Sequence, residues 1–333
     1  MSSLKNILEN KHPCKSIWFM RQAGRYLPEF RKIRSKNQDF IKLCLNSELS
    51  SEITLQPIKR FNLDSAIIFS DILMVPWALG QRVNFKKDYG PQVDEFNMDL
   101  LLNNNEKEFS KRLYPVYRAI EITRKKLEKE KSLISFIGAP WTLLVYMLSV
   151  KKDKRNLNFS KLNKNFDIEE IFKELIKYLK IHIKNQISAG ADVVQIFDSW
   201  AGLIPEENFK KFCIIPTLNL IDFCKEEKIR SICFPKGIKE KYEEFNNSVK
   251  PDGINIDSEI DPSWAKDKLK NVVIQGGLDP RILLKTDDEI FKGATKYIKA
   301  FKGMPYVFNL GHGLLPETDP AKVEKLINFY RSS

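Results

Sequence analysis

Eight short apolar segments recur along this chain, and most of the intervals between them are long enough to hold a helix. Each segment is a run of apolar, β-branched or aromatic residues, which is typical of strands covered on both faces in a parallel sheet. The intervals between the segments carry helical periodicity, so strands and helices alternate. We expect strands at 17–20, 66–69, 133–137, 193–197, 231–234, 253–256, 272–274 and 306–310, and helices most clearly at 168–187, 208–227, 287–301 and 320–331.

Eight strands alternating with helices predict an α/β fold, a single-domain (β/α)8 barrel with its active site at the carboxyl ends of the strands. A doubly wound open sheet is an alternative that the strand count leaves open. The chain has 333 residues, and no shift in composition or Pro/Ser-rich linker divides it, so we expect one domain over residues 1–333. Residues 83–105 are rich in Asn, Asp and Lys and are predicted to form an elaborated loop after the second strand.

The uncharged stretch 132–150 is the segment that most resembles a membrane span. Gly138-Ala139-Pro140 interrupts it, which favours a buried strand, a turn and the start of a helix. The N-terminus lacks the apolar core of a secretory signal, and five widely spaced cysteines predict reduced thiols. We therefore expect a cytoplasmic protein with no membrane partner.

The formal net charge of +12 favours anionic partners. Scattered lysines on a solvated surface explain most of this charge, and the sequence contains no zinc-finger spacing or RNP-type aromatic motif. We therefore expect no nucleic-acid partner. A polyanionic small molecule remains a suitable ligand for the part of the charge that lies near the strand ends.

Polar and Gly-rich residues follow every predicted strand. In a barrel these positions meet at one rim, where catalytic groups are placed. Any turn also uses Gly, Pro and Asp, so the set of eight junctions is more informative than each one alone. The junctions are 21-RQAGR-25, Ser70-Asp71, 138-GAPWT-142, Asp198-Ser199-Trp200, Pro235-Lys236-Gly237, Asp257, 275-QGGLDP-280 and Gly311-His312-Gly313.

Four charged or polar residues at these junctions are candidates for contacting a substrate. Arg21 and Arg25 flank the flexible Gly24, and paired guanidinium groups can hold carboxylates bidentately. Asp71 is either the N-cap of the next segment or an acceptor for substrate N–H groups. His312 lies between two glycines, which exposes its imidazole.

Tyr146 and Ser199 are weaker candidates, because an aromatic residue at helical spacing is usually core and Ser199 has no GxSxG sequence around it. The sequence also contains no GxxxxGK[ST], no GxGxxG after the first strand and no HExxH. Nucleotide hydrolysis, dinucleotide redox chemistry and zinc proteolysis therefore lose support. The candidates suit a polycarboxylate substrate and chemistry that needs no metal or nucleotide.

The run 18-WFMRQAGRYLPEFR-31 resembles the first signature of the uroporphyrinogen decarboxylase family, and 137-IGAPWTLLVYM-147 is similar to the second. Shorter matches continue in the family's order over nearly the whole chain. The sequence departs from the family at 238-IKEKYEEFNN-247, where charged residues replace the usual small ones. The shorter matches are 66-AIIFSDIL-73, 196-IFDSWAG-202, 234-FPKG-237, 275-QGGLDP-280 and 309-NLGHGLLPET-318.

The resemblance implies a homodimeric barrel enzyme, a carboxy-lyase that uses no cofactor and no metal. Members of the family convert uroporphyrinogen III to coproporphyrinogen III by decarboxylating four acetate side chains, a step of haem and chlorophyll biosynthesis. Carried over residue by residue, the resemblance assigns catalytic roles to Asp71 and Arg21. The substrate-binding residues that it implies are Arg21, Gln22, Ala23, Gly24, Arg25, Asp71, Tyr146, Ser199 and His312.

Two alternatives stay open at this point. Corrinoid- and thiol-linked methyltransferases of the same fold family use zinc held by a His-x-Cys pair and a further Cys. In this chain the residue two after His312 is Leu314. The second alternative is a non-catalytic tetrapyrrole-binding protein, which would bind without turnover.

Overall fold

The computed structural model describes residues 4–86, 90–150, 153, 156–159, 162 and 167–333. Its main sheet has eight strands in the order β1-β10-β9-β8-β7-β6-β5-β2, and all seven pairings are parallel. All eight predicted strands are present, with bounds that differ by a few residues. The strands are β1 (Lys15–Ile17), β2 (Ser65–Ile67), β5 (Ser132–Gly138), β6 (Val193–Asp198), β7 (Arg230–Pro235), β8 (Gly253–Ile256), β9 (Val273–Gly276) and β10 (Tyr306–Phe308).

Strands β1 and β2, the two ends of this order, meet through a short seam rather than a regular ladder. The backbone N–H of Asp64 donates to the Ile17 carbonyl at 3.1 Å, and the Ile17 N–H donates to Asp64 Oδ2 at 2.8 Å. The Gln22 side chain adds a bond to the Ser65 carbonyl at 3.0 Å. The sheet is therefore a nearly closed barrel, which confirms the predicted (β/α)8 fold over the open sheet.

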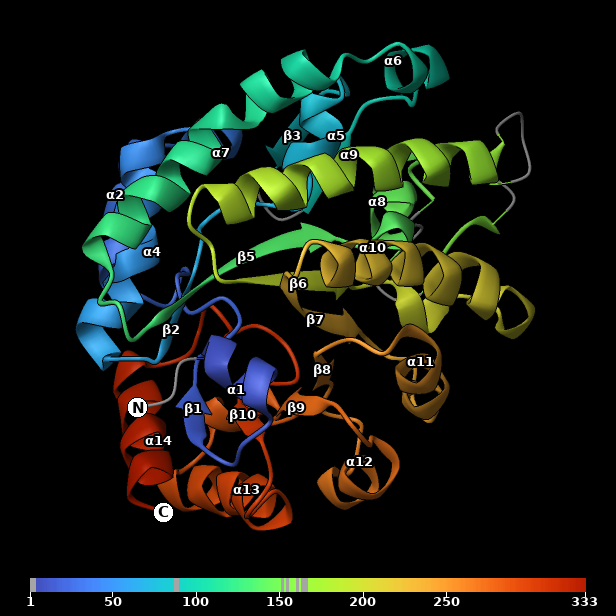
Figure 1. Cartoon of the computed structure of the whole chain (residues 1–333). Helices are drawn as coiled ribbons and strands as arrows, with labels where there is room; N and C mark the ends of the chain where they lie inside the picture. The colour runs from blue at the N-terminus through green and yellow to red at the C-terminus, as the bar shows by residue number, and fades with distance from the viewer. Residues whose placement is uncertain (1–3, 87–89, 151–152, 154–155, 160–161, 163–166) are drawn as a thin grey trace.

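Helices surround the strands and follow one another around the barrel (Figure 1). Polar residues cap many of them, as at Asp167, Thr286 and Asp319, whose side chains accept bonds from the first-turn N–H groups. The four helices expected most clearly are present. The outer helices are α2 (Pro28–Lys36), α3 (Phe40–Cys44), α4 (Ser47–Phe61), α5 (Met74–Ala78), α7 (Glu106–Lys126), α8 (Pro140–Met147), α9 (Ile168–Ser188), α10 (Ile215–Glu226), α11 (Lys241–Val249), α12 (Pro262–Lys268), α13 (Asp287–Ala300) and α14 (Pro320–Ser332).

The N-terminal end of the barrel is closed by helix α1 (Leu4–Asn10), which was not expected from the sequence. Leu4, Ile7 and Leu8 belong to the same buried cluster as inward-facing strand residues such as Val193 and Val273. Its contacts lie at strand beginnings: the Lys5 N–H donates to Ser132 Oγ, and a Cβ on Gly253 would lie 3.0 Å from a Leu8 methyl. We therefore look for a ligand site at the other end of the barrel, where the strands end.

Two sequence expectations need correction. Residues 83–105 are not a plain loop: they contain the antiparallel hairpin β3 (Val83–Lys86) and β4 (Gly90–Val93) and the short helix α6 (Met98–Leu102). Their polar composition and Pro91 concealed the strands. The first barrel strand covers 15–17 rather than 17–20, because the Asn309 side chain, not a backbone carbonyl, accepts the Met20 N–H at 3.0 Å.

Two further segments follow the sequence analysis more closely. The uncharged stretch 132–150 is strand β5, a turn and helix α8, as predicted. In the part of the chain that the structure describes, no helix is both long and apolar enough to cross a membrane. The predicted helix 208–227 is divided into a π-helical turn at Lys210–Ile214 and α10.

Candidate active site at the carboxyl ends of the strands

The loop 21–25 turns sharply over the end of β1. Arg21 has a φ of +60°, a left-handed conformation that costs energy for a residue with a Cβ and is held by surrounding structure. Gly24 allows the turn, because a Cβ there would lie 2.8 Å from the Arg21 carbonyl oxygen. The strained backbone directs the Arg21 side chain over the mouth of the barrel. Arg25 is exposed on the same loop.

Gln22 differs from its neighbours in the loop, because it is fully buried. Its Oε1 accepts the Phe19 N–H at 3.0 Å, its Nε2 donates to the Ser65 carbonyl, and its own carbonyl accepts the Tyr26 hydroxyl at 2.9 Å. These bonds use the polar groups of Gln22 to hold the loop. Ala23 is half-buried and packs against the core.

The Arg21 side chain lies against Gly313, at the end of the last barrel strand. A Cβ on Gly313 would lie 2.3 Å from Arg21 Cδ and 2.8 Å from Nε, so only glycine leaves room for the guanidinium arm. Desolvation lowers the pKa of Arg21, and the negative charge of Asp71 opposes this shift. The side chain is exposed to solvent although protein surrounds much of the guanidinium group.

Asp71 follows β2 by four residues and lies close enough to Arg21 for their charges to interact. Its Oδ1 accepts the Leu73 N–H at 2.8 Å, so it holds the turn before α5 but is not the N-cap of that helix, which is Leu73. Desolvation raises the pKa of Asp71 to about 6, against the opposing effects of the Leu73 N–H and Arg21. Near neutral pH the group is a desolvated carboxylate with one backbone hydrogen bond.

Tyr146 reaches the same region from α8 and interacts electrostatically with Asp71 and Arg21. Desolvation raises its pKa, while the nearby polar group of Trp200 lowers it. The two rings meet edge to face, with centroids 6.0 Å apart. Tyr146 is therefore a half-buried phenol that stays neutral and can donate a hydrogen bond.

The Trp200 partner is itself fixed by a buried carboxyl group at the end of β6. Asp198 Oδ1 accepts the Thr142 hydroxyl at 2.6 Å, and Thr142 Oγ1 accepts the backbone N–H of Trp200 at 3.2 Å. Cys213, in the π-helical turn, donates its thiol to Asp198 Oδ2 at 3.8 Å. Burial raises the pKa of Asp198 to about 7. This cluster supports the Tyr146 side of the mouth, and sequence analysis did not identify it.

His312 and Ser199 complete the predicted set. His312 is half-buried after β10, and desolvation together with Lys236 and Arg21 lowers its pKa to about 3, so the imidazole is neutral at physiological pH. Ser199 is exposed just after β6. The structure thus brings Arg21, Asp71, Tyr146 and His312 into electrostatic contact and leaves Ser199 at the rim.

Aromatic side chains line the barrel interior below this charged rim. Phe136, Phe197 and Phe234 come from β5, β6 and β7 and belong to the interior cluster. Phe197 packs edge to face on both others, with centroids 5.7 and 6.4 Å apart. Phe136 and Phe197 remain half-exposed. An apolar surface beside unpaired charges explains why carboxylates here are desolvated, and it suits a ligand with an apolar ring system.

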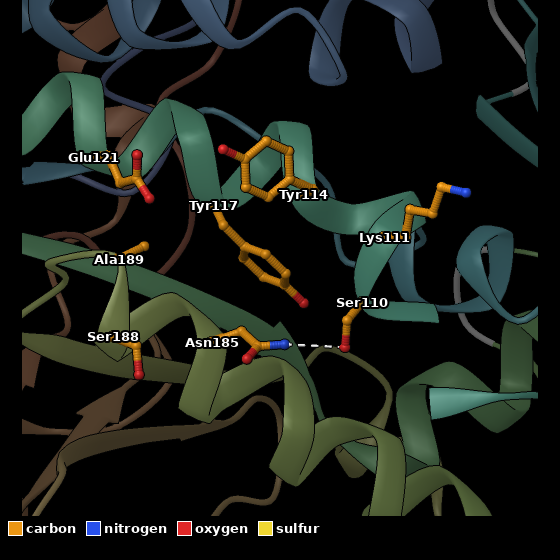
Figure 2. Close-up of a pocket in the computed structure, with 8 residues that line it drawn as sticks. All are labelled: Ser110, Lys111, Tyr114, Tyr117, Glu121, Asn185, Ser188 and Ala189. Atoms are coloured by element: carbon orange, nitrogen blue, oxygen red, sulfur yellow. Dashed lines mark hydrogen bonds between the residues drawn. The ribbon is translucent and has the colours of Figure 1, made fainter. Parts of the chain in front are cut away.

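A concave region lies elsewhere on the molecule, away from these residues. Figure 2 shows an open groove between α7 and α9, lined by Tyr114, Tyr117 and Asn185 among others, with Asn185 donating to Ser110 Oγ at 3.2 Å. It lies on the outer helical layer and contains no predicted site residue. Among the described residues, no three His, Cys, Asp or Glu side chains are grouped so that they could hold a metal.

The fold and the mouth define a (β/α)8 barrel that presents cationic and carboxylate groups around an apolar interior. The chain belongs to the uroporphyrinogen decarboxylase family, whose model, described as Uroporphyrinogen decarboxylase (URO-D), matches residues 4–333. Curated relatives named uroporphyrinogen decarboxylase are 40% identical in Rickettsia felis, 42% in Rickettsia bellii and 41% in Orientia tsutsugamushi. These alignments cover 95–99% of this chain and 95–97% of the relatives.

Solved structures with low sequence identity share the fold. A methyltransferase from Methanosarcina mazei superposes with a TM-score of 0.75 at 18% identity, covering 100% of this chain and 99% of that one. A B12-independent methionine synthase from Shewanella sp. W3-18-1 gives a TM-score of 0.57 at 12% identity, with 86% of each chain covered. At these identities the likeness concerns the barrel alone.

Proposed function

We propose that this protein is a cofactor-independent carboxy-lyase that converts uroporphyrinogen III to coproporphyrinogen III in tetrapyrrole biosynthesis. The observation that carries the proposal is that Arg21 lies near the desolvated Asp71, without an ion pair between them, over an apolar interior in a chain of the uroporphyrinogen decarboxylase family. A cyclic tetrapyrrole with eight carboxylates presents N–H donors at its centre and anions at its edge. Asp71 is suited to accept hydrogen bonds from the central N–H groups, and the arginines are suited to bind the carboxylates at the edge.

Each cycle replaces an acetate carboxylate by a proton. Protonation of a pyrrole ring carbon makes the ring electron-poor, and the C–C bond to the carboxylate then breaks, so that the electron pair enters the ring and CO2 leaves. The exocyclic methylene takes a proton and becomes a methyl group, while the ring carbon returns its proton. The net change is the uptake of one proton and the loss of one CO2, four times per substrate.

Asp71 is proposed to stabilise the cationic ring while it accepts hydrogen bonds from the pyrrole N–H groups. Its charge is effective because few groups compensate it: one N–H bonds to it and Arg21 lies nearby. Arg21 is proposed to hold a carboxylate and to take part in proton transfer, and Arg25 to hold a second carboxylate.

The remaining residues are proposed to position the substrate arms. Tyr146 and neutral His312 offer hydrogen bonds inside the mouth, and Ser199 offers a hydroxyl at its rim. Ala23 and Gly24 keep the loop close to the ring, while Gln22 acts by holding that loop in place. No metal or cofactor enters this scheme.

We also propose that the protein is a cytoplasmic homodimer. The dimer is carried over from the family resemblance alone. The cytoplasmic assignment is supported by the cysteines, since all five are free in the structure.

The test is anaerobic incubation of the purified protein with uroporphyrinogen III and no added cofactor, followed by separation of the oxidised products by carboxylate number. Successive seven-, six-, five- and four-carboxylate products are expected. Binding without turnover would instead favour a tetrapyrrole carrier. Absence of binding, or stoichiometric zinc with methyl transfer to a thiol, would contradict the proposal.

A further inference from the structure

Lys236 is a charged residue at the mouth that the predicted site does not include. It directly follows β7 (Arg230–Pro235), and its side chain is half-buried. In the eight-strand order β7 stands four places from β1, so Lys236 comes from the wall of the barrel opposite Arg21. The charges of Lys236, Arg21 and His312 nevertheless act on one another, which places the ammonium toward the mouth.

The backbone around Lys236 is tightly fixed. Its N–H donates to the Asp198 carbonyl at 3.0 Å, and its carbonyl accepts the Gly202 N–H at 2.9 Å. The next residue, Gly237, packs against Gly202 so closely that a Cβ on Gly202 would lie 2.4 Å from the Gly237 oxygen. The position of Lys236 is therefore determined by the barrel frame rather than by a flexible loop.

The Lys236 ammonium has no hydrogen-bond or ion-pair partner among the described residues, although a carboxylate is close. Asp257 interacts with it electrostatically, but both oxygens of Asp257 already accept other donors. Oδ2 accepts the Gly237 N–H at 2.7 Å and the Tyr242 hydroxyl at 3.1 Å, and Oδ1 accepts the Glu259 N–H at 3.0 Å. Asp257 thus fixes the loop and leaves Lys236 unpaired.

Several other buried or half-buried cations in the described chain do have such partners, whereas Lys180 lies over the Phe223 ring. Arg124, Arg230 and Arg331 each form an ion pair with an aspartate at 3.0 Å. Lys131 donates to Asn62 Oδ1 at 2.6 Å and to the Leu63 carbonyl at 3.0 Å. An unpaired, partly desolvated ammonium facing a second cation is unfavourable, and an anion bound between the two would relieve it.

We infer that Lys236 is an additional substrate-binding residue, which holds a peripheral carboxylate on the opposite side of the mouth from Arg21 and Arg25. This inference rests on the proposed function, since it needs a substrate with carboxylates on several sides. Lys236 then selects for a ligand wide enough to place anions on both walls at once. Its contribution is to binding and orientation, and the proton needed for turnover comes from elsewhere.

The test compares Lys236→Met with Lys236→Arg, which keeps the charge, and with Lys239→Met as a matched control. Lys239 is exposed on the same segment, and its side chain forms no hydrogen bond or ion pair in the part of the chain that the structure describes, so its loss changes only surface charge. We would measure KM and kcat for uroporphyrinogen III, together with the Kd of uroporphyrin, an unreactive octacarboxylate. Thermal unfolding of each variant checks folding, and Lys236→Gln replaces Lys236→Met if the latter does not fold.

We expect Lys236→Met to raise KM and Kd about tenfold, the effect of losing one charge-assisted hydrogen bond, with kcat changed less than about threefold. Lys236→Arg should restore binding, and Lys239→Met should match the parent protein. Unchanged KM and Kd in Lys236→Met would overturn the inference, as would a loss confined to kcat that arginine does not rescue. If the parent protein itself does not turn over uroporphyrinogen, the proposed function fails and the inference fails with it.

Discussion

The two ends of the barrel use charge in opposite ways. At the N-terminal end, three aspartates stand just before strands, and each accepts a backbone N–H from a neighbouring strand while it pairs with an arginine. The ion pairs are Asp64–Arg331, Asp192–Arg124 and Asp252–Arg230, each at 3.0 Å, and the backbone donors are Ile17, Leu133 and Ser231. The charges here satisfy one another: Arg331 and Arg124 join strands to helices, and Arg230 joins two neighbouring strands.

At the mouth the charged groups lie close together, but among the described residues they form no ion pairs with one another. In the described chain, the side chains of Arg21, Arg25 and Lys236 form no ion pair within 4.0 Å, and Asp71 accepts only a backbone N–H. Desolvated, unpaired groups lower stability, so a fold retains them where a ligand supplies the missing partners. The difference teaches that the N-terminal end stabilises the barrel and the mouth holds the chemistry.

Arg21→Met tests the functional side of this contrast and should give the largest effect. Removing the guanidinium should lower kcat/KM at least about a thousandfold, because a carboxylate and a proton-transfer group are lost together. The free energy of unfolding in urea should change by less than about 0.5 kcal/mol, since Arg21 has no partner to lose. Turnover near that of the parent protein would remove Arg21 from the proposed mechanism.

Gly313→Ala should lower kcat/KM about a hundredfold without touching any charged group. The new Cβ would lie 2.3 Å from Arg21 Cδ, so the flexible arm must move away from its present path. A misplaced catalytic group costs activity on this scale. Steady-state kinetics and a crystal structure of the variant would check the displacement, and an unmoved Arg21 with full activity would contradict the account.

Asp192→Asn should act in the opposite sense, on stability rather than on activity. Asp192 Oδ2 accepts the Leu133 N–H at 2.8 Å and pairs with Arg124 at 3.0 Å. Loss of the charge should lower the free energy of unfolding by about 2 kcal/mol, measured by urea denaturation. At a temperature where the variant is folded, kcat should equal that of the parent. A fall in kcat with unchanged stability would show that the N-terminal end of the barrel also contributes to catalysis.

Much of this architecture could be predicted from the sequence. Continuous apolar runs gave the eight strands, and amphipathic periodicity gave helices such as 168–187, because both patterns follow directly from burial. The hairpin within 83–105 was missed, since its strands are short and polar. Helix α1 was missed too: seven residues carry little periodicity, and their role depends on the barrel being present.

The sequence predicted which strand ends carry the site residues, but not which groups those residues contact. The expectation that residues following barrel strands meet at one rim placed Arg21, Asp71 and His312 together. In the structure, Arg21 interacts electrostatically with each of the other two. It could not show that Gln22 is turned inward, because that depends on the seam with Ser65. Nor could it separate Lys236 from the other lysines, because what distinguishes Lys236 is that the oxygens of Asp257 are already occupied.

The most direct test of the account is the pH dependence of kcat/KM for the parent protein and for Asp71→Asn, measured anaerobically with uroporphyrinogen III. Desolvation raises the Asp71 pKa from 3.8 to about 6, so the carboxylate is charged above that pH and is lost by protonation below it. We predict that kcat/KM of the parent falls about tenfold from pH 7 to pH 5. Asp71→Asn should be at least about a thousandfold less active at pH 7, without that acid limb and with unchanged folding. A folded Asp71→Asn protein with near-normal turnover and the same acid limb would contradict the central claim that this carboxylate stabilises the cationic substrate.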